Sequence, residues 1–255
     1  MTDNHRTAPA AGRRGAEVLA LPPGRELPPA TEKWIVDGLV RAMPGLRARE
    51  LFTLRRDMLI DADYIVAGVD RERDQVVSLL TSRWAQLPSG RSCLHVMIQF
   101  VGDGYRNGEV FGRSWSTHFA RLLTEGHPFP EVIALKTYNP VVHCAMAAFS
   151  AHPEVGMYPD LAGRDHRAAE VAAEVAGVLA PGAAFDPARG VLRGIGRPRD
   201  LYRERPVSYV PEANAYFAAN AAPGDRVLCL LQVPTRAGAQ AILTALGVPL
   251  PSGQG

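Results

Sequence analysis

Residues 92–149 carry the pattern around which the rest of the chain is organised. In order they read SCLHVMIQF (92–100), GDGYRNGEVFG (102–112), SWSTHFARLL (114–123), EVIALK (131–136) and VVHCAMAAF (141–149). The first and fourth segments are apolar runs of strand length, and the third places Trp115, Phe119 and Leu122 at helical spacing. The pattern therefore predicts strand, glycine loop, helix, strand, helix.

The glycine loop and the helix after it have the ingredients of a phosphate site. Glycines let main-chain amides approach a ligand without a side chain between them. A helix start adds free N–H groups and the positive end of the helix dipole, which suits phosphate. An ordinary strand-to-helix turn has the same pattern and is the alternative. Before the second helix, Asn139 is placed to cap free donors and Pro140 suits the first helical position.

Residues 95–123 and 132–149 resemble the acyl-CoA-binding motifs of the GNAT (GCN5-related N-acetyltransferase) superfamily. The matching residues are Tyr105, Arg106 and Gly108 in the loop, with Asn139 and Phe149 in the second module. Upstream, residues 31–42 and 46–59 are predicted to form two helices, and YIVAGV (64–69) and the segment 75–84 are similar to that family's second and third strands. The resemblance extends over residues 31–149.

The resemblance implies an α+β fold with a mixed, mostly antiparallel central sheet flanked by helices and an extended C-terminal part. It implies an acyltransferase that moves an acetyl or acyl group from acetyl-CoA or another acyl-CoA to an amine of a small molecule. Main-chain groups at the end of the first strand and in the loop would then contact the donor. The residues expected to bind CoA are Gln99, Phe100, Val101, Tyr105, Arg106, Asn107, Gly108, Gly112 and Asn139.

Acyl transfer to an amine also needs a group that accepts the amine proton and a group that protonates the departing thiolate. His95 is the candidate base because the ordinary imidazole pKa is near neutral, and strand alternation predicts it on the same face as Gln99. Tyr138 is the candidate acid, and His143 could face the thiol or solvent. The alternative for His95 is a core histidine with its hydrogen bonds satisfied.

Two departures from the family pattern keep other functions open. Arg106 is followed by Gly108 but the next glycine is Gly112, and Met146 stands where many members have a catalytic tyrosine. An irregular loop would suit the thioester of an acyl carrier protein as donor. A GNAT-like binding module without catalysis is the alternative from another functional class.

The cysteine and histidine residues suggest a metal site, but their spacing argues against one. Cys93, His95, His143 and Cys144 come from elements expected to be neighbours. Thiolate and imidazole suit zinc, but adjacent residues on one strand or helix point apart, so no metal is predicted. Three scattered cysteines indicate a reducing compartment, and no apolar run reaches transmembrane length, so we expect a cytoplasmic protein.

Composition places limits on organisation and partners. Residues 1–30 contain five prolines and no aromatic residue, so we expect a disordered tail, then one domain over 31–249 and a flexible tail over 250–255. A net charge of +2 makes no case for nucleic acid or membrane binding, and a homodimer is left open.

The basic residues are nearly all arginine, since only Lys33 and Lys136 are lysines. Lys136 is therefore unusual on a strand beside the expected site. Downstream, a local run of arginines would form either a solvated edge or a docking patch for an acidic partner such as a carrier protein or RNA. Its members are Arg189, Arg193, Arg197, Arg199, Arg203 and Arg205.

Overall fold

The computed structural model describes residues 15–106, 108–161 and 167–248. Its nine described strands form one sheet in the order β1-β2-β3-β4-β5-β9-β8-β7, with β6 also paired to β9. They are β1 Glu17–Leu21, β2 Tyr64–Asp70, β3 Gln75–Gln86, β4 Ser92–Val101, β5 Val132–Thr137, β6 Gly156–Tyr158, β7 Phe185–Asp186, β8 Val191–Leu192 and β9 Arg226–Gln232. Only β4 and β5 are parallel among these described pairs. The predicted α+β class with a mixed, mostly antiparallel sheet is confirmed.

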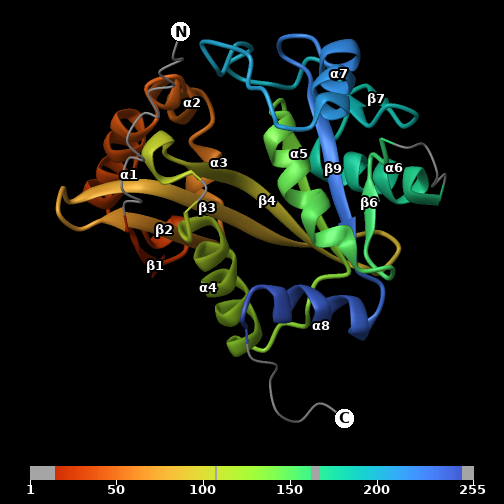
Figure 1. Ribbon diagram of the computed structural model, residues 1–255, viewed down its shortest axis with the longest axis horizontal. Helices are drawn as coiled ribbons and strands as arrows, with labels where there is room; N and C mark the ends of the chain where they lie inside the picture. The colour runs from red at the N-terminus through yellow and green to blue at the C-terminus, as the bar shows by residue number, and fades with distance from the viewer. Residues whose placement is uncertain (1–14, 107, 162–166, 249–255) are drawn as a thin grey trace, which may run out of the picture.

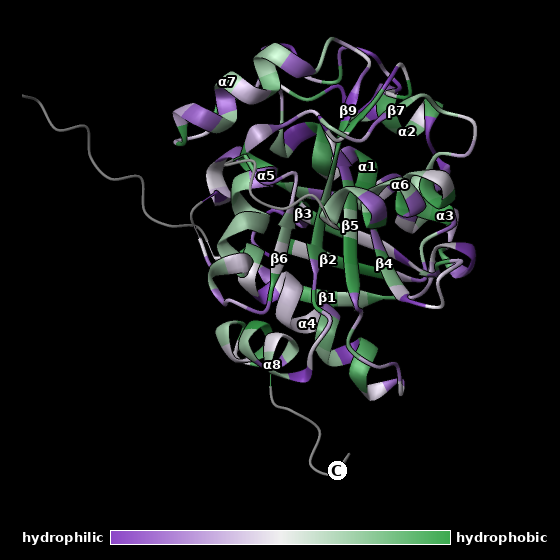
Figure 2. Ribbon diagram, turned by 90° about the vertical axis from the view of Figure 1, so that its right-hand side faces the viewer, coloured by the Kyte–Doolittle hydropathy of each residue, from purple (hydrophilic) through white to green (hydrophobic). Residues whose placement is uncertain are grey.

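Helices cover both faces of the sheet, and the strands between them form the most hydrophobic layer (Figures 1 and 2). The helices are α1 Pro29–Ala42, α2 Ala48–Leu54, α3 Asp57–Ile60, α4 Val110–Thr124, α5 Pro140–Ala147, α6 Arg167–Leu179, α7 Pro211–Asn220 and α8 Arg236–Ala245. Within the described ranges, none of them combines the length and apolarity needed to cross a bilayer.

Strand alternation decides which helices share a face. On β2, Ile65 packs with the cluster of α1, α2 and α3, whereas Val66 packs with α4. On β5, Ala134 packs with α6, whereas Ile133 packs with α4, α5, α7 and α8. The face covered by α1–α3 over β2–β4 is therefore continued by α6 over β5 and β9.

Two predicted boundaries in the first half of the chain are wrong. Helix α4 begins at Val110 rather than 114, so Gly112 lies in its first turn and not in the loop. The helix expected over 46–59 is divided into α2 and α3, because the chain breaks helical geometry at Arg55.

The expected disordered tail over residues 1–30 also needs correction. Residues 17–21 form β1, which extends the sheet by pairing Glu17 with Val69 and Leu21 with Ile65. Helix α1 then begins at Pro29. Main-chain pairing to β2 orders this segment despite its prolines, and residues 1–14 and 249–255 lie outside the described residues.

Gly38 allows α1 to approach β3 closely, and this contact can be tested. A Cβ at Gly38 would lie 2.7 Å from the Val76 nitrogen and 2.8 Å from its oxygen. Gly38→Ala should therefore destabilise the protein by about 1–3 kcal/mol, as overpacking does. Chemical denaturation measures the effect.

The matched control is Gly177→Ala in α6, where no described atom lies within 4 Å of the added Cβ. Alanine there should raise stability by up to about 1 kcal/mol through helix propensity. A Gly38→Ala protein as stable as this control would contradict the packing of α1 on β3.

Candidate functional site

The candidate site begins where β4 and β5 separate. Their parallel pairing runs from Cys93 opposite Val132 to Val96 opposite Leu135. β4 nevertheless continues to Val101, still paired with β3, and β5 continues to Thr137. Beyond Val96, the main-chain groups of β4 that point away from β3 therefore face a gap instead of a neighbouring strand.

A bulge in β4 decides which side chains reach each side of this gap. Thr81 of β3 lies opposite Ile98 while the next residue, Ser82, lies opposite Val96, so Met97 is the additional residue. One additional residue in a strand reverses the face of the sheet to which each later side chain points. His95 and Gln99 consequently lie on opposite faces, and the predicted shared face is wrong.

A pocket of about 90 Å³ occupies the gap and opens on the α2 and α3 side. Its walls come from β4, β5, the α2–α3 region, the loop before α7 and the start of β9. They include the sequence candidates His95, Gln99, Phe100 and Tyr138, together with Arg55, Lys136, Arg197, Tyr202 and Arg226.

His95 lies in this pocket without any protein partner among the described residues. It is 7% exposed, and both of its ring nitrogens lack a hydrogen bond. Burial, followed by the charges of Lys136, Arg83 and Arg55, holds its pKa well below 6.5. The imidazole is therefore neutral at pH 7 and has a nitrogen lone pair to offer a ligand.

Gln99 presents a second unsatisfied group from the α4 side of the sheet. Neither its amide nitrogen nor its carbonyl oxygen has a partner in the described chain. Its neighbour on β3, Leu80, belongs to the core beneath α4. Buried polar atoms without partners are uncommon, so Gln99 and His95 make the two sides of the gap a candidate ligand site.

Tyr138 and Asn139 stand at the end of β5. Guanidinium groups lie over the Tyr138 ring, with Arg205 at 5.0 Å and Arg226 at 6.0 Å from its centroid. The Asn139 side chain accepts a hydrogen bond from the Val141 amide at 2.9 Å and so caps α5 as predicted.

Several residues of the glycine loop make contacts within the protein and so have a structural role. The Tyr105 hydroxyl donates to Asp70 in the core, and Arg106 pairs with Asp103 at 2.8 Å on the surface. A Cβ at Gly102 would press on Ala42 at 2.9 Å. Asn107 lies outside the described residues. Gly108, Phe111 and Gly112 are partly exposed, whereas Val110 at the start of α4 is buried, and Val101 is half-buried.

Gly112 keeps the start of α4 open. An added Cβ there meets no described atom within 4 Å. The first amides of a helix have no partner within it, so this turn offers donors to an anion. That accessibility fits a pyrophosphate, whereas the Tyr105 side chain does not contribute to it.

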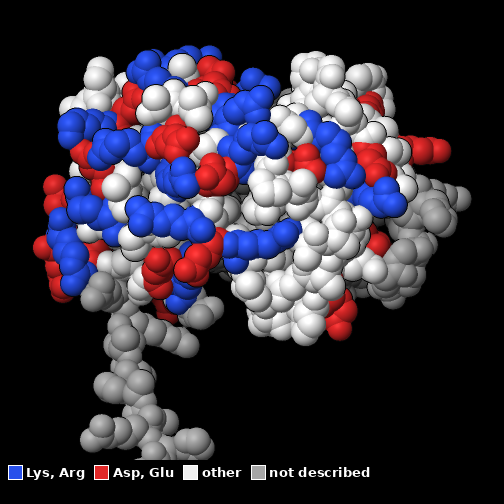
Figure 3. Space-filling model, turned by 90° about the horizontal axis from the view of Figure 1, so that it is seen from above, with Lys and Arg blue, Asp and Glu red and all other residues white. Residues whose placement is uncertain are grey.

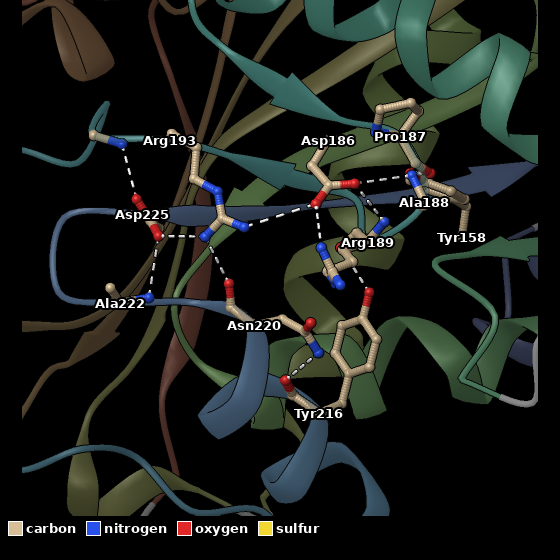
Figure 4. Close-up of polar contacts among 11 residues, drawn as sticks. Tyr158, Asp186, Pro187, Ala188, Arg189, Arg193, Tyr216, Asn220, Ala222 and Asp225 are labelled. Carbon is tan, nitrogen blue, oxygen red and sulfur yellow. Dashed lines mark hydrogen bonds and ion pairs between the residues drawn. The ribbon is translucent and has the colours of Figure 1, made fainter.

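Two members of the arginine run, Arg189 and Arg193, belong to an internal network (Figure 4). Arg189 pairs with Asp186 at 3.1 Å, and Arg193 pairs with Asp225 at 2.9 Å. Arg193 also donates to the Asn220 carbonyl at 2.9 Å. The Arg193 contacts join the β7–β8 hairpin to the end of α7 and the start of β9, whereas the Arg189 pair lies within the hairpin turn.

Sequence reasoning missed Arg226 and Tyr202 because both follow the part that resembles a known family. The signal for Arg226 was a charged residue at the start of the apolar run VLCLLQV. Tyr202 had no comparable signal. Met146 is buried in the core, and the described residues contain no cluster of His, Cys, Asp or Glu suited to a metal.

Removing the cap should destabilise the protein without disturbing the rest of the sheet. Asn139→Ala should cost about 1 kcal/mol, because the Val141 amide loses its acceptor. Thr235→Ala is the matched control, since Thr235 caps α8 through the Gly238 amide at 3.1 Å, far from the pocket. Urea denaturation of both variants is the measurement, and an Asn139→Ala protein with unchanged stability would contradict the capping role.

The buried neutral state of His95 makes stability depend on pH. The unfolded imidazole takes a proton near pH 6.5, whereas the folded one does so only well below it, so stability falls as pH drops below 6.5. His95→Gln removes this contribution, and the variant should lose less stability than wild type between pH 6.5 and 5. Denaturation at both pH values measures the loss, and equal losses would contradict the burial of His95.

No protein-family model matches the sequence, and no curated protein matches it. Solved structures give partial overlaps. A GNAT family N-acetyltransferase from Escherichia coli in complex with CoA has 17% identity and a TM-score of 0.37, over 57% of this chain and 76% of that chain.

Two other solved structures give similar values. A GNAT family acetyltransferase from Brucella melitensis in complex with acetyl-CoA has 12% identity and a TM-score of 0.32, over 47% of this chain and 75% of that chain. An aminoglycoside acetyltransferase from an uncultured soil metagenomic sample, in complex with sisomicin, has 12% identity and a TM-score of 0.36, over 54% and 88%. At these scores the overlaps alone assign neither a family nor an activity.

Proposed function

We propose that the protein transfers an acyl group from acetyl-CoA or another acyl-CoA to an amine of a small molecule. The observation that supports this best is the gap between β4 and β5, which exposes main-chain groups of β4 and opens into the pocket holding His95 and Tyr138. The motif resemblance in residues 95–149 points to the same chemistry.

In this proposal the donor thioester lies along β4 past the bulge. Main-chain amides of residues 99–101 that face the gap would donate to the thioester oxygen as negative charge develops on it. The acyl end would lie in the gap near the Gln99 side chain. The pyrophosphate would lie against residues 108–112, where the α4 start supplies free amides.

The acceptor reaches the thioester from the α2 and α3 side. Its neutral nitrogen forms a bond to the acyl carbon, and the carbon–sulfur bond breaks to release the CoA thiolate. His95 takes the proton that leaves the nitrogen, and Tyr138 supplies a proton to the sulfur. The products are an amide and the CoA thiol, and transfer of the proton from imidazolium to phenolate restores both side chains.

Calorimetric titration with CoA tests the donor site. Wild type should bind CoA, and Gly112→Val should abolish binding because the added side chain covers the amides of the α4 start. Arg106→Ala should weaken binding by a smaller factor that shrinks further at high salt, since Arg106 is exposed. Gly177→Ala serves as the control and should bind as wild type does.

Absence of binding to wild type at millimolar CoA would refute the acyl-CoA donor. The carrier-protein donor and the non-catalytic binding module would then be the predictions left from the sequence. A cytoplasmic location and a homodimer are separate predictions that this titration does not address.

A further inference from the structure

The pocket walls carry an excess of positive charge. Arg55, Lys136, Arg197 and Arg226 line it beside His95, and the lining that the structure describes includes no Asp or Glu. Seen from above, basic side chains also gather across the middle of this face (Figure 3). Such a wall attracts an anion and repels an ammonium group.

Arg226 is the strongest indication of an anion site, because its guanidinium is buried and has no carboxylate partner among the described residues. It is 8% exposed, and its hydrogen bonds within the described part of the chain go to main-chain oxygens, those of Asp225 at 2.7 Å and Pro198 at 3.3 Å. Burial is the largest cause that lowers the pKa of its guanidinium. A buried cation is costly unless an anion pairs with it.

The neighbouring carboxylate of Asp225 is already engaged elsewhere (Figure 4). It accepts from Arg193 at 2.9 Å, from the Gly194 amide at 2.9 Å and from the Ala222 amide at 3.1 Å. Its charge therefore belongs to the network that anchors β8 and α7. It does not form an ion pair with Arg226 within the described chain.

Gly196 holds the Arg226 guanidinium in place. A Cβ at Gly196 would lie 2.1 Å from one terminal nitrogen of Arg226 and 2.3 Å from the central carbon. The guanidinium thus lies directly on the Gly196 main chain, at the wall of the pocket. Only glycine leaves room for this arrangement.

Two further cations face the same space. Lys136 donates to the Leu179 carbonyl at 2.7 Å, and burial followed by Arg55 lowers its pKa to about 8. Arg197 is exposed and donates to the carbonyls of Gly194 and Gly196 at 3.1 Å each.

Arg55 differs from these cations because it already has a carboxylate partner. Its guanidinium forms two hydrogen bonds with Asp57, at 2.9 Å and 2.8 Å. The uncompensated charge of the pocket therefore comes from Arg226, Arg197 and Lys136.

We propose that the acyl acceptor is an amine that also carries an anionic group, a carboxylate or a phosphate, which Arg226, Arg197 and Lys136 bind. The inference rests on the proposed function and names its substrate class. Planar guanidinium groups suit both anions, since each offers paired oxygens. With the anion held at the β9 side, the amine points across the pocket to His95.

Binding of matched amines to the full-length protein, without CoA, tests this inference. The probes are O-phosphoethanolamine against ethanolamine and β-alanine against propylamine, titrated by calorimetry at constant ionic strength in chloride. At least one anion-bearing member should bind at least tenfold more tightly than its cationic partner. The pair with the larger difference identifies phosphate or carboxylate as the recognised group.

Variants assign the binding to the pocket. Arg226→Met and Arg197→Gln should each weaken binding of the preferred probe tenfold or more, and Gly196→Ala should weaken it by displacing the guanidinium. Arg197 is exposed, so its variant remains informative if Arg226→Met fails to fold. Arg49→Gln, an exposed residue of α2 paired with Asp37, is the control and should leave binding unchanged.

Equal binding of cationic and anion-bearing probes, binding of none, or unchanged binding in Arg197→Gln would overturn the inference. These outcomes are independent of CoA. A protein that binds the anionic probes but not CoA would retain this subsite while refuting the proposed donor, and the reverse result would retain the donor alone.

Discussion

The separation of β4 from β5 after four paired residues is the constraint on which the candidate site depends. Up to Val96 the two strands satisfy one another's main-chain groups, and beyond it β4 keeps only β3 as a partner. The Met97 bulge lies at this point and turns the following side chains to the other face. The end of the pairing exposes main-chain groups of β4, and the bulge places His95 and Gln99 on opposite sides of the gap.

The C-terminal part of the chain supplies strand β9 and the loop that borders the gap between β4 and β5. β9 pairs with β5 and extends the sheet, and the loop between β8 and α7 returns over the gap. The contacts of Asp225 with Arg193 and the Gly194 amide fasten the start of that loop, and Arg197 and Arg226 line the pocket. Charge that looks like a surface patch in the sequence is thus divided between a structural network and the wall of the pocket.

Sequence patterns predict elements well where a local cause decides the structure. Apolar runs identify β4, β5 and β9, and the Asn139-Pro140 pair marks the start of α5. They fail where a distant partner decides, as for β1, which exists because β2 offers a free edge. The Met97 bulge depends on the register of β3, so alternation alone misplaced His95 relative to Gln99.

The residues of the pocket and its surroundings divide in the same way, into those with a local sequence signal and those without one. His95, Gln99 and Tyr138 belong to elements with local signals, and all three line the pocket. Arg226 and Gly196 come together only through the return of the C-terminal loop, and no local pattern pairs an arginine with the glycine beneath it. Tyr105 is the opposite case, a residue with a motif signal that does not line the pocket. Its hydroxyl donates to Asp70, so its side chain lies in the core.

A crystal structure with acetyl-CoA bound is the measurement that decides whether the gap is the donor site. The acyl carbonyl should lie between residues 99–101 of β4 and Tyr138, the phosphates should contact the amides at the start of α4, and the β4–β5 gap should stay open. Acetyl-CoA bound on another face, or a gap closed by pairing of β4 with β5 past Val96, would contradict this arrangement.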